Sequence, residues 1–396
     1  MIKNNPSYKL ALIHDWFLEK SIGGAEYVTK IIDESLTKNF HKPDIYCLVD
    51  SLKESRNVLF GERKINTSFI QKLPFGKSNV QNYLPLIPFA IEQFDLSNYE
   101  LIISSSHLAA KGVLTSPDQL HISYVHTPMR YAWDQMNTYL KQSALSRAGL
   151  EPLIRYFLFK LREWDYISGS RPDILLSNSN FTARRIKKYW GIKSKVIYPP
   201  VDIARFNYRQ KRDNFYLSVN RLVPNKRVDL LVKAFNKLGL PLFIVGEGPE
   251  KNKLKKIAKS NIVFMGKRSN LEIEQLMSTC RSFIYAGVED FGIAPVEAMA
   301  SGAPIIAFGK GGILDTVTCI NSKDNNTYPT GAFFKKQNES AIFDIVSWFE
   351  NNEVWKNFNS EKIHKVASKF SRENFEKKFS KFIDKSWNDF NEYKNH

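Results

Sequence analysis

Residues 215–238 have the sequence FYLSVNRLVPNKRVDLLVKAFNKL, in which a short apolar run, a polar turn and an amphipathic stretch follow one another. The apolar run Phe215–Val219 is typical of a buried strand, and apolar residues at helical spacing predict a helix over Val228–Leu238. A strand that leads through a short loop into a helix is the repeating half of a β-α-β unit. The stretch therefore predicts an α/β fold with parallel sheets.

The same alternation recurs along the chain and restarts in its second half. Between the two series, Pro199 and Pro200 cannot continue a central strand, and a polar segment follows at 207–214. We therefore expect two Rossmann-like domains, residues 1–205 and 206–370. The expected buried strands are Lys9–His14, Asp44–Val49, Leu101–Ser105, His121–His126, Ile174–Asn178 and Val196–Tyr198, then Phe215–Val219, Leu242–Val245, Ile262–Met265, Phe283–Ala286 and Pro304–Phe308.

The composition is that of an ordinary globular protein, with 43% hydrophobic and 24% charged residues among 396. Cys47, Cys280 and Cys319 lie far apart and form no Cys-x-x-Cys, so neither a disulfide framework nor a zinc site is indicated. The apolar stretch near the N-terminus is broken by His14 and Asp15, which argues against a signal peptide. We expect a cytoplasmic protein whose contact with a membrane is at most peripheral.

The formal net charge of +17 is the one unusual bulk property. Between Tyr139 and Asp213 there are sixteen Lys and Arg against six Asp and Glu, a net of +10. A basic surface indicates an anionic partner such as nucleic acid, anionic lipid or a phosphorylated substrate, although solvated helix faces would give the same count. Within this segment, residues 152–166 predict an amphipathic helix that either lies on an anionic membrane or packs in the core. Its apolar side chains are Leu153, Ile154, Phe157, Leu158, Leu161 and Trp164, beside Arg155, Lys160 and Arg162.

Cations and carboxylates follow two of the expected strands in the second half. Arg221 and Lys226 flank a proline turn after Val219, where both could converge on a diphosphate or remain solvated. The segment Glu289-Asp-Phe-Gly-Ile-Ala-Pro-Val-Glu297 follows another strand, and we expect Pro295 to be the first residue of a helix. Glu289 could then bind a sugar hydroxyl and Glu297 a ribose, because carboxylate oxygens accept charge-assisted hydrogen bonds. Glu297 could instead be only a favourable charge on the helix dipole.

Two further constellations follow strands of the first half. The Gly23-Gly24 pair allows close approach of the backbone to a phosphate at a helix N-terminus, or makes a simple turn. His126, at the end of an expected strand, could hydrogen-bond a substrate hydroxyl or be structural. In the second half, the turns at 246–249 and 309–312 are weaker candidates for a nucleotide pocket.

Missing motifs exclude several reaction classes. The sequence has no Asp-x-Asp to hold a divalent cation on a diphosphate, so we expect no metal. It also lacks a Gly-x-Ser-x-Gly elbow and a Walker loop, which argues against serine hydrolases and P-loop enzymes.

Taken together, these residues resemble the family-4 retaining glycosyltransferases of the GT-B fold, whose hallmark is two glutamates separated by seven residues. The likeness covers nearly the whole chain, from Gly23-Gly24 to the turn at 309–312. It implies two Rossmann-like domains whose parallel sheets face a central cleft. It also implies that a final helix at 371–396 crosses back to the N-terminal domain, where Phe375, Phe379, Phe382 and Trp387 would dock.

The resemblance also implies roles for individual residues. Arg221 and Lys226 match the residues that bind the diphosphate in the family. Glu289 matches the residue that binds the donor sugar, and Glu297 matches the residue that binds the ribose. The position that is often glutamate in the family is Asp315 here, and it is left out of the site. The implied catalytic set is His126, Arg221, Lys226 and Glu289, and the implied donor-binding set is Gly23, Gly24, Arg221, Lys226, Gly246, Phe291, Gly292, Ile293 and Glu297.

More narrowly, residues 126–131 and 220–224 look like bacterial O-antigen mannosyltransferases that use GDP-mannose. This likeness implies transfer of mannose to a polyprenyl-diphosphate-linked glycan, in the cytoplasm or on the cytoplasmic face of the inner membrane. A UDP-sugar donor, a nucleotide-sugar epimerase of the same fold, and a nucleic-acid-binding protein remain as alternatives. We expect no cofactor besides the nucleotide-sugar co-substrate, and no nucleic acid, since no recognition module is visible.

Overall fold

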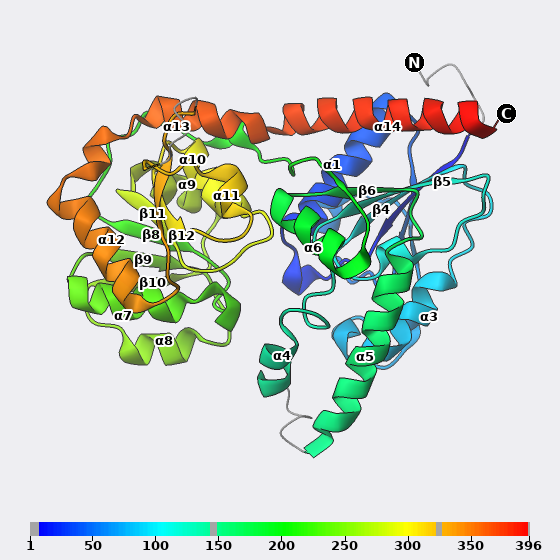
Figure 1. Cartoon of the computed structure of the whole chain (residues 1–396), viewed down its shortest axis with the longest axis horizontal. Helices are drawn as coiled ribbons and strands as arrows, with labels where there is room; N and C mark the ends of the chain where they lie inside the picture. Colours follow the sequence, from blue (N-terminus) through cyan, green and yellow to red (C-terminus); the bar gives the residue numbers. More distant parts are fainter. Residues whose placement is uncertain (1–7, 143–148, 322–326, 395–396) are drawn as a thin grey trace. The chain divides into compact units, whose positions relative to one another are not determined.

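The computed structural model describes residues 8–142, 149–321 and 327–394. The chain forms two compact units, the first made of Met1–Tyr198 with Phe375–His396 and the second of Pro199–Asn374. Each unit contains one parallel sheet flanked by helices (Figure 1). The α/β class with two Rossmann-like parallel sheets is therefore confirmed.

The sheet of the first unit has seven strands in the order β3-β2-β1-β4-β5-β6-β7. The chain runs outward from β1 to one edge and from β4 to the other, so the order reverses between β1 and β4. Ligands of open α/β sheets bind outside the carboxyl ends of the strands at such a reversal. The strands are β1 Leu10–His14, β2 Asp44–Cys47, β3 Ile65–Thr67, β4 Leu101–Ser106, β5 Leu120–Val125, β6 Ile174–Ser177 and β7 Lys195–Val196.

The helices of the first unit cover this sheet. The final helix, α14, buries Phe375, Phe379, Ile383 and Trp387 in one cluster with residues of α1 and of the central strands, while Phe382 is partly buried against it. The helices are α1 Gly24–Asn39, α2 Arg56–Leu59, α3 Ile87–Glu92, α4 Met136–Gln142, α5 Glu151–Ser168, α6 Asn180–Trp190 and α14 Arg372–Lys394.

The sheet of the second unit has the order β10-β9-β8-β11-β12-β13, with its reversal between β8 and β11. Its strands are β8 Tyr216–Val219, β9 Leu242–Val245, β10 Ile262–Gly266, β11 Ser282–Tyr285, β12 Ile305–Phe308 and β13 Gly331–Phe334. Its helices are α7 Val228–Leu238, α8 Lys251–Ile257, α9 Asn270–Thr279, α10 Ile293–Ala300, α11 Ile313–Thr316, α12 Glu339–Asn351 and α13 Ser360–Ala367.

Every strand expected from the sequence is present, with ends that differ by a few residues. Two short strands, β3 and β13, were not expected; both lie at sheet edges. The predicted start of the helix at Pro295 is wrong, because α10 begins at Ile293. Proline is tolerated at its third position because the first N–H groups of a helix have no intrahelical acceptor.

Of the two alternatives for the apolar stripe of α5, packing in the core holds for most of its residues. Leu158 and Leu161 are buried in the core, and Ile154 and Trp164 pack against it. Leu153 and Phe157 remain exposed. Helical spacing alone could not distinguish the two sides, since α5 carries large apolar residues on both. The basic segment 139–213 that contains α5 lies partly outside the described residues, at 143–148.

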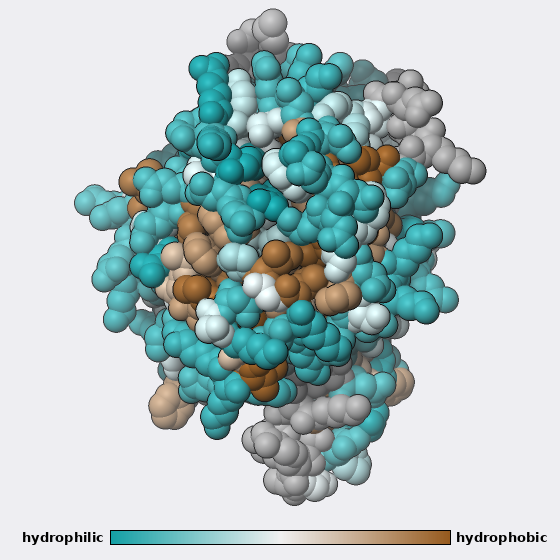
Figure 2. Space-filling model, turned by 90° about the vertical axis from the view of Figure 1, so that its left-hand side faces the viewer, coloured by the Kyte–Doolittle hydropathy of each residue, from teal (hydrophilic) through white to brown (hydrophobic). Residues whose placement is uncertain are grey.

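The face drawn in Figure 2 is mainly hydrophilic, with hydrophobic residues gathered in a few areas. In the part of the chain that the structure describes, no helix is both long and apolar enough to cross a membrane.

Candidate functional site

Lys226 and Glu289 form an ion pair at the reversal of the second sheet. Lys226 ends the short 3₁₀ turn η8, Pro224–Lys226, that follows β8, and Glu289 follows the neighbouring strand β11. The side chains are 22% and 20% exposed, so both remain partly open to solvent. The side chain of Arg221, on the same loop as Lys226, is exposed and forms no hydrogen bond or ion pair with the described residues. Two cations and a carboxylate are thus available at one sheet edge.

Gly246 fixes the loop that carries Arg221. Its φ of +132° is accessible mainly to glycine, and a Cβ there would lie 1.9 Å from the carbonyl oxygen of Asn220. The N–H of Leu222 donates to the carbonyl of Glu247 at 2.8 Å. The turn after β9 therefore packs backbone to backbone against the loop after β8 and positions it.

The turn at 309–312 supports Glu289 in the same way. The N–H of Gly312 donates to the carbonyl of Glu289 at 2.8 Å. A Cβ on Gly311 would lie 2.6 Å from that carbonyl oxygen. The turns at 246–249 and 309–312, which the sequence indicated as weak candidates for a nucleotide pocket, thus hold the loops that carry Arg221 and Glu289.

The N-terminus of α10 lies directly after the Glu289 loop. Gly292, with a φ of +94°, is its N-cap, and Ile293 is its first residue. Phe291 turns its side chain inward against Phe370, with ring centroids 5.5 Å apart. The N–H groups at the start of α10 have no helical acceptor, so they can hydrogen-bond an anion.

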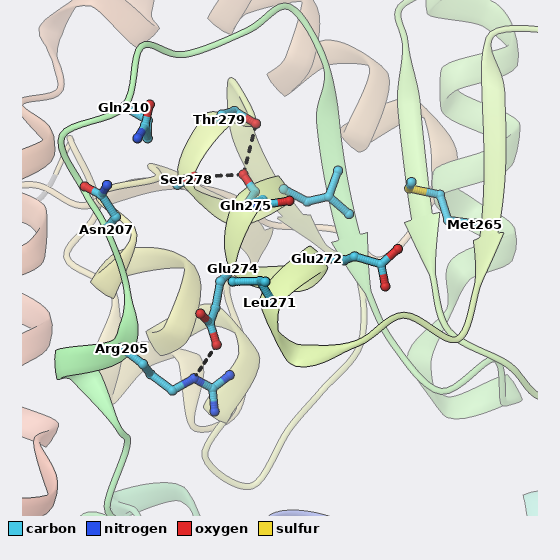
Figure 3. A pocket seen from close by; sticks show the side chains of 11 residues that line it. Arg205, Asn207, Gln210, Met265, Leu271, Glu272, Glu274, Gln275, Ser278 and Thr279 are labelled. Atoms are coloured by element: carbon cyan, nitrogen blue, oxygen red, sulfur yellow. Dashed lines mark hydrogen bonds and ion pairs between the residues drawn. The ribbon is translucent and has the colours of Figure 1, made fainter.

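Glu297 lies in the second turn of α10, not in the first turn as predicted, because the helix starts earlier. Burial raises the pKa of its carboxyl above 4.5. The positive charge of Arg205 lowers this pKa, while the negative charges of Glu274 and Asp202 raise it further. Arg205 and Glu274 form an ion pair at 2.8 Å and line a cavity of about 740 Å³ (Figure 3). Glu297 therefore lies near this cavity. The cavity could not be predicted from the sequence, because the residues that line it belong to no motif.

His126, directly after β5, lies at the carboxyl edge of the first sheet and is buried. Its Nε2 is 2.8 Å from Ser105 Oγ, and Asn178 donates to its carbonyl oxygen at 2.9 Å. Burial, together with repulsion from His14 and His107, holds the pKa of its imidazole well below 6.5. His126 is thus a neutral imidazole near neutral pH.

The Gly23-Gly24 pair opens α1, as a phosphate-binding turn would. The N–H of Gly23 already donates to the carboxylate of Glu26 at 2.9 Å, so this carboxylate caps the start of α1. A phosphate here would have to displace that carboxylate, so the implied contact of Gly23 and Gly24 with phosphate stays a prediction.

Asp15 and His107 form a buried pair that the sequence did not predict. Asp15 is fully buried and accepts hydrogen bonds from the backbone N–H groups of residues 107–110 at 2.5–3.0 Å, and from His107 Nδ1 at 2.6 Å. These donors hold the pKa of Asp15 below its usual range despite burial. Burial favours neutral His107, but the carboxylate of Asp15 outweighs it and raises its pKa.

Among the described residues, one group could hold a metal ion. It consists of His14, Glu26 and His107, whose ligand atoms lie within 4.8 Å of one another. All three residues belong to the first unit, and nothing in the sequence indicated a metal site there.

Comparison with known proteins identifies the family of the chain. Residues 22–205 match the model "Glycosyltransferase Family 4", and residues 202–370 match "Glycosyl transferases group 1". Together the two models match most of the chain, which therefore belongs to the family-4 glycosyltransferases of the GT-B fold.

Relatives over nearly the full length are named as mannosyltransferases. The chain is 26% identical to "Alpha-1,3/1,6-mannosyltransferase ALG2" of Saccharomyces cerevisiae, over 95% of this chain and 84% of the relative. It is 22% identical to "O-antigen chain mannosyltransferase C" of Escherichia coli, over 93% of each. The solved structure of Anabaena Alr3699/HepE in complex with UDP has a TM-score of 0.66 at 16% identity, covering 95% of this chain and 100% of the other. That last likeness shows the fold alone.

Proposed function

We propose that this glycosyltransferase transfers mannose from GDP-mannose to a lipid-linked or polysaccharide glycan, with retention of configuration and without a metal. The observation that carries the proposal is the likeness to proteins named as mannosyltransferases along nearly the whole chain. The resemblance to bacterial O-antigen mannosyltransferases in residues 126–131 and 220–224 points to the same donor.

The donor would lie along the loops of the second unit. Arg221, Lys226 and the first N–H groups of α10 would hold the diphosphate, and Glu289 would accept hydrogen bonds from sugar hydroxyls. Glu297 would bind the ribose, with the base toward the cavity lined by Arg205 and Glu274. These groups follow β8 or β11 or lie in α10, and β8 and β11 are neighbours at the reversal of the second sheet.

In the reaction, the bond from the anomeric carbon to the phosphate oxygen breaks while the acceptor oxygen bonds to the same face of the sugar. The acceptor proton passes to the leaving phosphate, so no protein nucleophile is needed. Lys226 and Arg221 would stabilise the negative charge that develops on the diphosphate. Holding the acceptor oxygen close to the anomeric carbon, on the face that the phosphate leaves, lowers the entropic part of the barrier.

A lipid-linked acceptor agrees with the exposed side of α5. Tyr156, Phe159, Tyr166 and Ile167 are 44–58% exposed there. The cations Arg155 and Lys160 pair with Glu151 and Glu163 of the same helix, so α5 adds little net charge. Attraction to an anionic bilayer would come from the charge of +17, and the aromatic side chains would enter the interface.

Product formation tests the proposal. The purified chain is given GDP-mannose and a polyprenyl-diphosphate-linked saccharide in the presence of EDTA, and the anomeric configuration of the product is read by NMR. An α-mannoside is expected, and Lys226→Ala should form little of it. Transfer from a UDP-sugar alone would show that GDP-mannose is not the donor. Conversion of the nucleotide-sugar in the absence of an acceptor would favour an epimerase. Gel shifts with nucleic acid in the absence of nucleotide-sugar binding would favour the nucleic-acid alternative.

A sedimentation assay with anionic vesicles tests the proposed membrane contact of α5. The variant with Tyr156, Phe159 and Tyr166 replaced by serine should sediment less with anionic vesicles than the parent. Leu271→Ser in the second unit, where the leucine is 65% exposed, is the matched control and should behave like the parent. Equal sedimentation of both variants would remove α5 from the membrane contact.

A further inference from the structure

His126 is the last member of a chain of buried hydrogen bonds that starts in α1. Its Nε2 lies 2.8 Å from Ser105 Oγ, and Ser105 Oγ lies 2.7 Å from Thr29 Oγ1. Thr29 Oγ1 lies 2.8 Å from the carbonyl oxygen of Ala25. Thr29 and Ser105 are fully buried, so solvent does not compete for these bonds. The two ends of the chain differ, because a carbonyl oxygen can only accept whereas an imidazole nitrogen can do either.

The carbonyl end fixes the direction of the first bond. Thr29 must donate its one hydroxyl hydrogen to Ala25, since two oxygens 2.8 Å apart repel without a hydrogen between them. His14 gives a second constraint. Its Nδ1 lies 2.9 Å from the carbonyl oxygen of Ser105, so this nitrogen carries a hydrogen and cannot accept one from Thr29, which is 3.1 Å away.

The remaining bonds then have only one arrangement. The hydroxyl hydrogen of Thr29 is already donated to Ala25, so Ser105 donates its own hydroxyl hydrogen to Thr29. Ser105 in turn has none left for His126, so the hydrogen between them belongs to the imidazole. The opposite direction, from Thr29 through Ser105 to His126, would leave the oxygens of Thr29 and Ala25 in contact with no hydrogen between them.

This arrangement fixes the tautomer of His126. A neutral imidazole with its hydrogen on Nε2 has a lone pair on Nδ1. Nδ1 of His126 forms no hydrogen bond with any residue in the described parts of the chain. An alcohol that reached it would therefore find an acceptor and not a donor.

We propose that Thr29 and Ser105 are positioning residues that hold His126 in its Nε2–H form, so that Nδ1 accepts a hydrogen bond from a substrate hydroxyl. The inference rests on the proposed function only for the substrate; the tautomer belongs to the protein alone. His14 assists by donating to the backbone of Ser105.

Nitrogen NMR of the full chain, labelled with ¹⁵N at its histidines, tests the tautomer directly. The protein has seven histidines, and the signals of His126 are those lost in His126→Gln. At neutral pH we expect Nε2 of His126 to resonate as a protonated nitrogen and Nδ1 as an unprotonated one. Observation of the Nδ1–H form in the parent protein would overturn the proposal whatever the donor is.

Thr29→Val and Ser105→Ala test the positioning role. Each breaks the chain, so His126 should become a mixture of tautomers, and kcat should fall about 5- to 10-fold, the scale of one neutral hydrogen bond, with the KM for the donor nearly unchanged. Thr29→Ser keeps the hydroxyl and should restore both readouts. A pure Nε2–H form and unchanged kcat in Thr29→Val and Ser105→Ala would overturn the proposal. If neither variant folds, the tautomer of His126 in the parent protein, measured by nitrogen NMR, decides whether the proposal holds.

Failure of this inference can be told apart from failure of the proposed function. A parent protein that shows the Nε2–H form but transfers no mannose supports the hydrogen-bond chain and removes the function. A parent that transfers mannose with His126 in the Nδ1–H form does the reverse.

Discussion

Lys226 and Glu289 meet as an ion pair although they follow different strands, β8 and β11, which are neighbours at the reversal of the second sheet. In the proposed function these two side chains bind opposite ends of the donor's reacting bond. A diphosphate would draw Lys226 toward its oxygens, and Glu289 would then be free to accept hydrogen bonds from the sugar. The pair thus keeps both groups in place and partly neutralised until a donor binds.

Replacement of Lys226 by alanine should lower kcat by ~10² or more, the scale of losing one preorganised donor of charge stabilisation. Steady-state kinetics with GDP-mannose measure the change. Arg227→Ala is the control on the same loop, because Arg227 pairs with Asp229 at 3.1 Å and not with Glu289. Near-normal turnover of Lys226→Ala would remove Lys226 from the site.

Binding of the nucleotide should depend on the protonation of Glu297. Because burial raises the pKa of Glu297, its carboxylate is lost as the pH falls through a value above 4.5, earlier than for an exposed glutamate. Affinity for GDP should fall in that range, and Glu297→Gln should bind about 10- to 100-fold more weakly at neutral pH, the scale of hydrogen bonds to a charged acceptor. A pH dependence in the glutamine variant equal to that of the parent would exclude Glu297 as its source.

The buried ion pair between Lys111 and Asp165 should matter for stability. Its Nζ and Oδ1 atoms lie 2.7 Å apart, and Trp133 and Trp190 donate to the other carboxylate oxygen. Asp165→Leu would leave a buried cation unpaired, which costs about 3–5 kcal/mol of unfolding free energy. Urea denaturation measures it. Glu151→Ala breaks an exposed pair on the same helix and should cost less than about 1 kcal/mol; equal effects would contradict the account.

The pair of Asp15 and His107 should make stability depend on pH in two windows. The folded pKa of His107 lies above 6.5, so its contribution is complete below 6.5 and is lost as the pH rises through the folded value. The folded pKa of Asp15 lies below 3.8, so its contribution is complete above 3.8 and is lost as the pH falls through the folded value. Urea midpoints from pH 6 upward should fall in the parent and stay flatter in His107→Gln. If the urea midpoints of the parent and of His107→Gln changed in parallel with pH, a group other than His107 would be the source of the pH dependence.

Strands and loop positions could be predicted from the sequence because buried parallel strands are short apolar runs with polar ends. That pattern placed Arg221, Lys226 and Glu289 after strands, and the sheet order then brought the last two together. The edge strands β3 and β13 were missed since each has only three or four residues and one of them begins with glycine.

The rest depends on contacts between distant residues. Asp15 gave no signal because its partners, the backbone N–H groups of 107–110, have no side-chain pattern. The apolar stripe of α5 could not be assigned to core or surface from its spacing. Hydrogen-bond direction at His126 depends on Thr29, 97 positions away in sequence, and no motif encodes it.

The central claim is tested most directly by calorimetric titration of the purified protein, without added metal, with GDP-mannose, UDP-glucose, UDP-N-acetylglucosamine and GDP. The account predicts selective binding of GDP-mannose and GDP, weakened in Glu297→Ala. Selective binding of a UDP-sugar would keep the fold and discard mannose as the donor sugar. No binding of any nucleotide would contradict the assignment of the loops after β8 and β11 as a donor site.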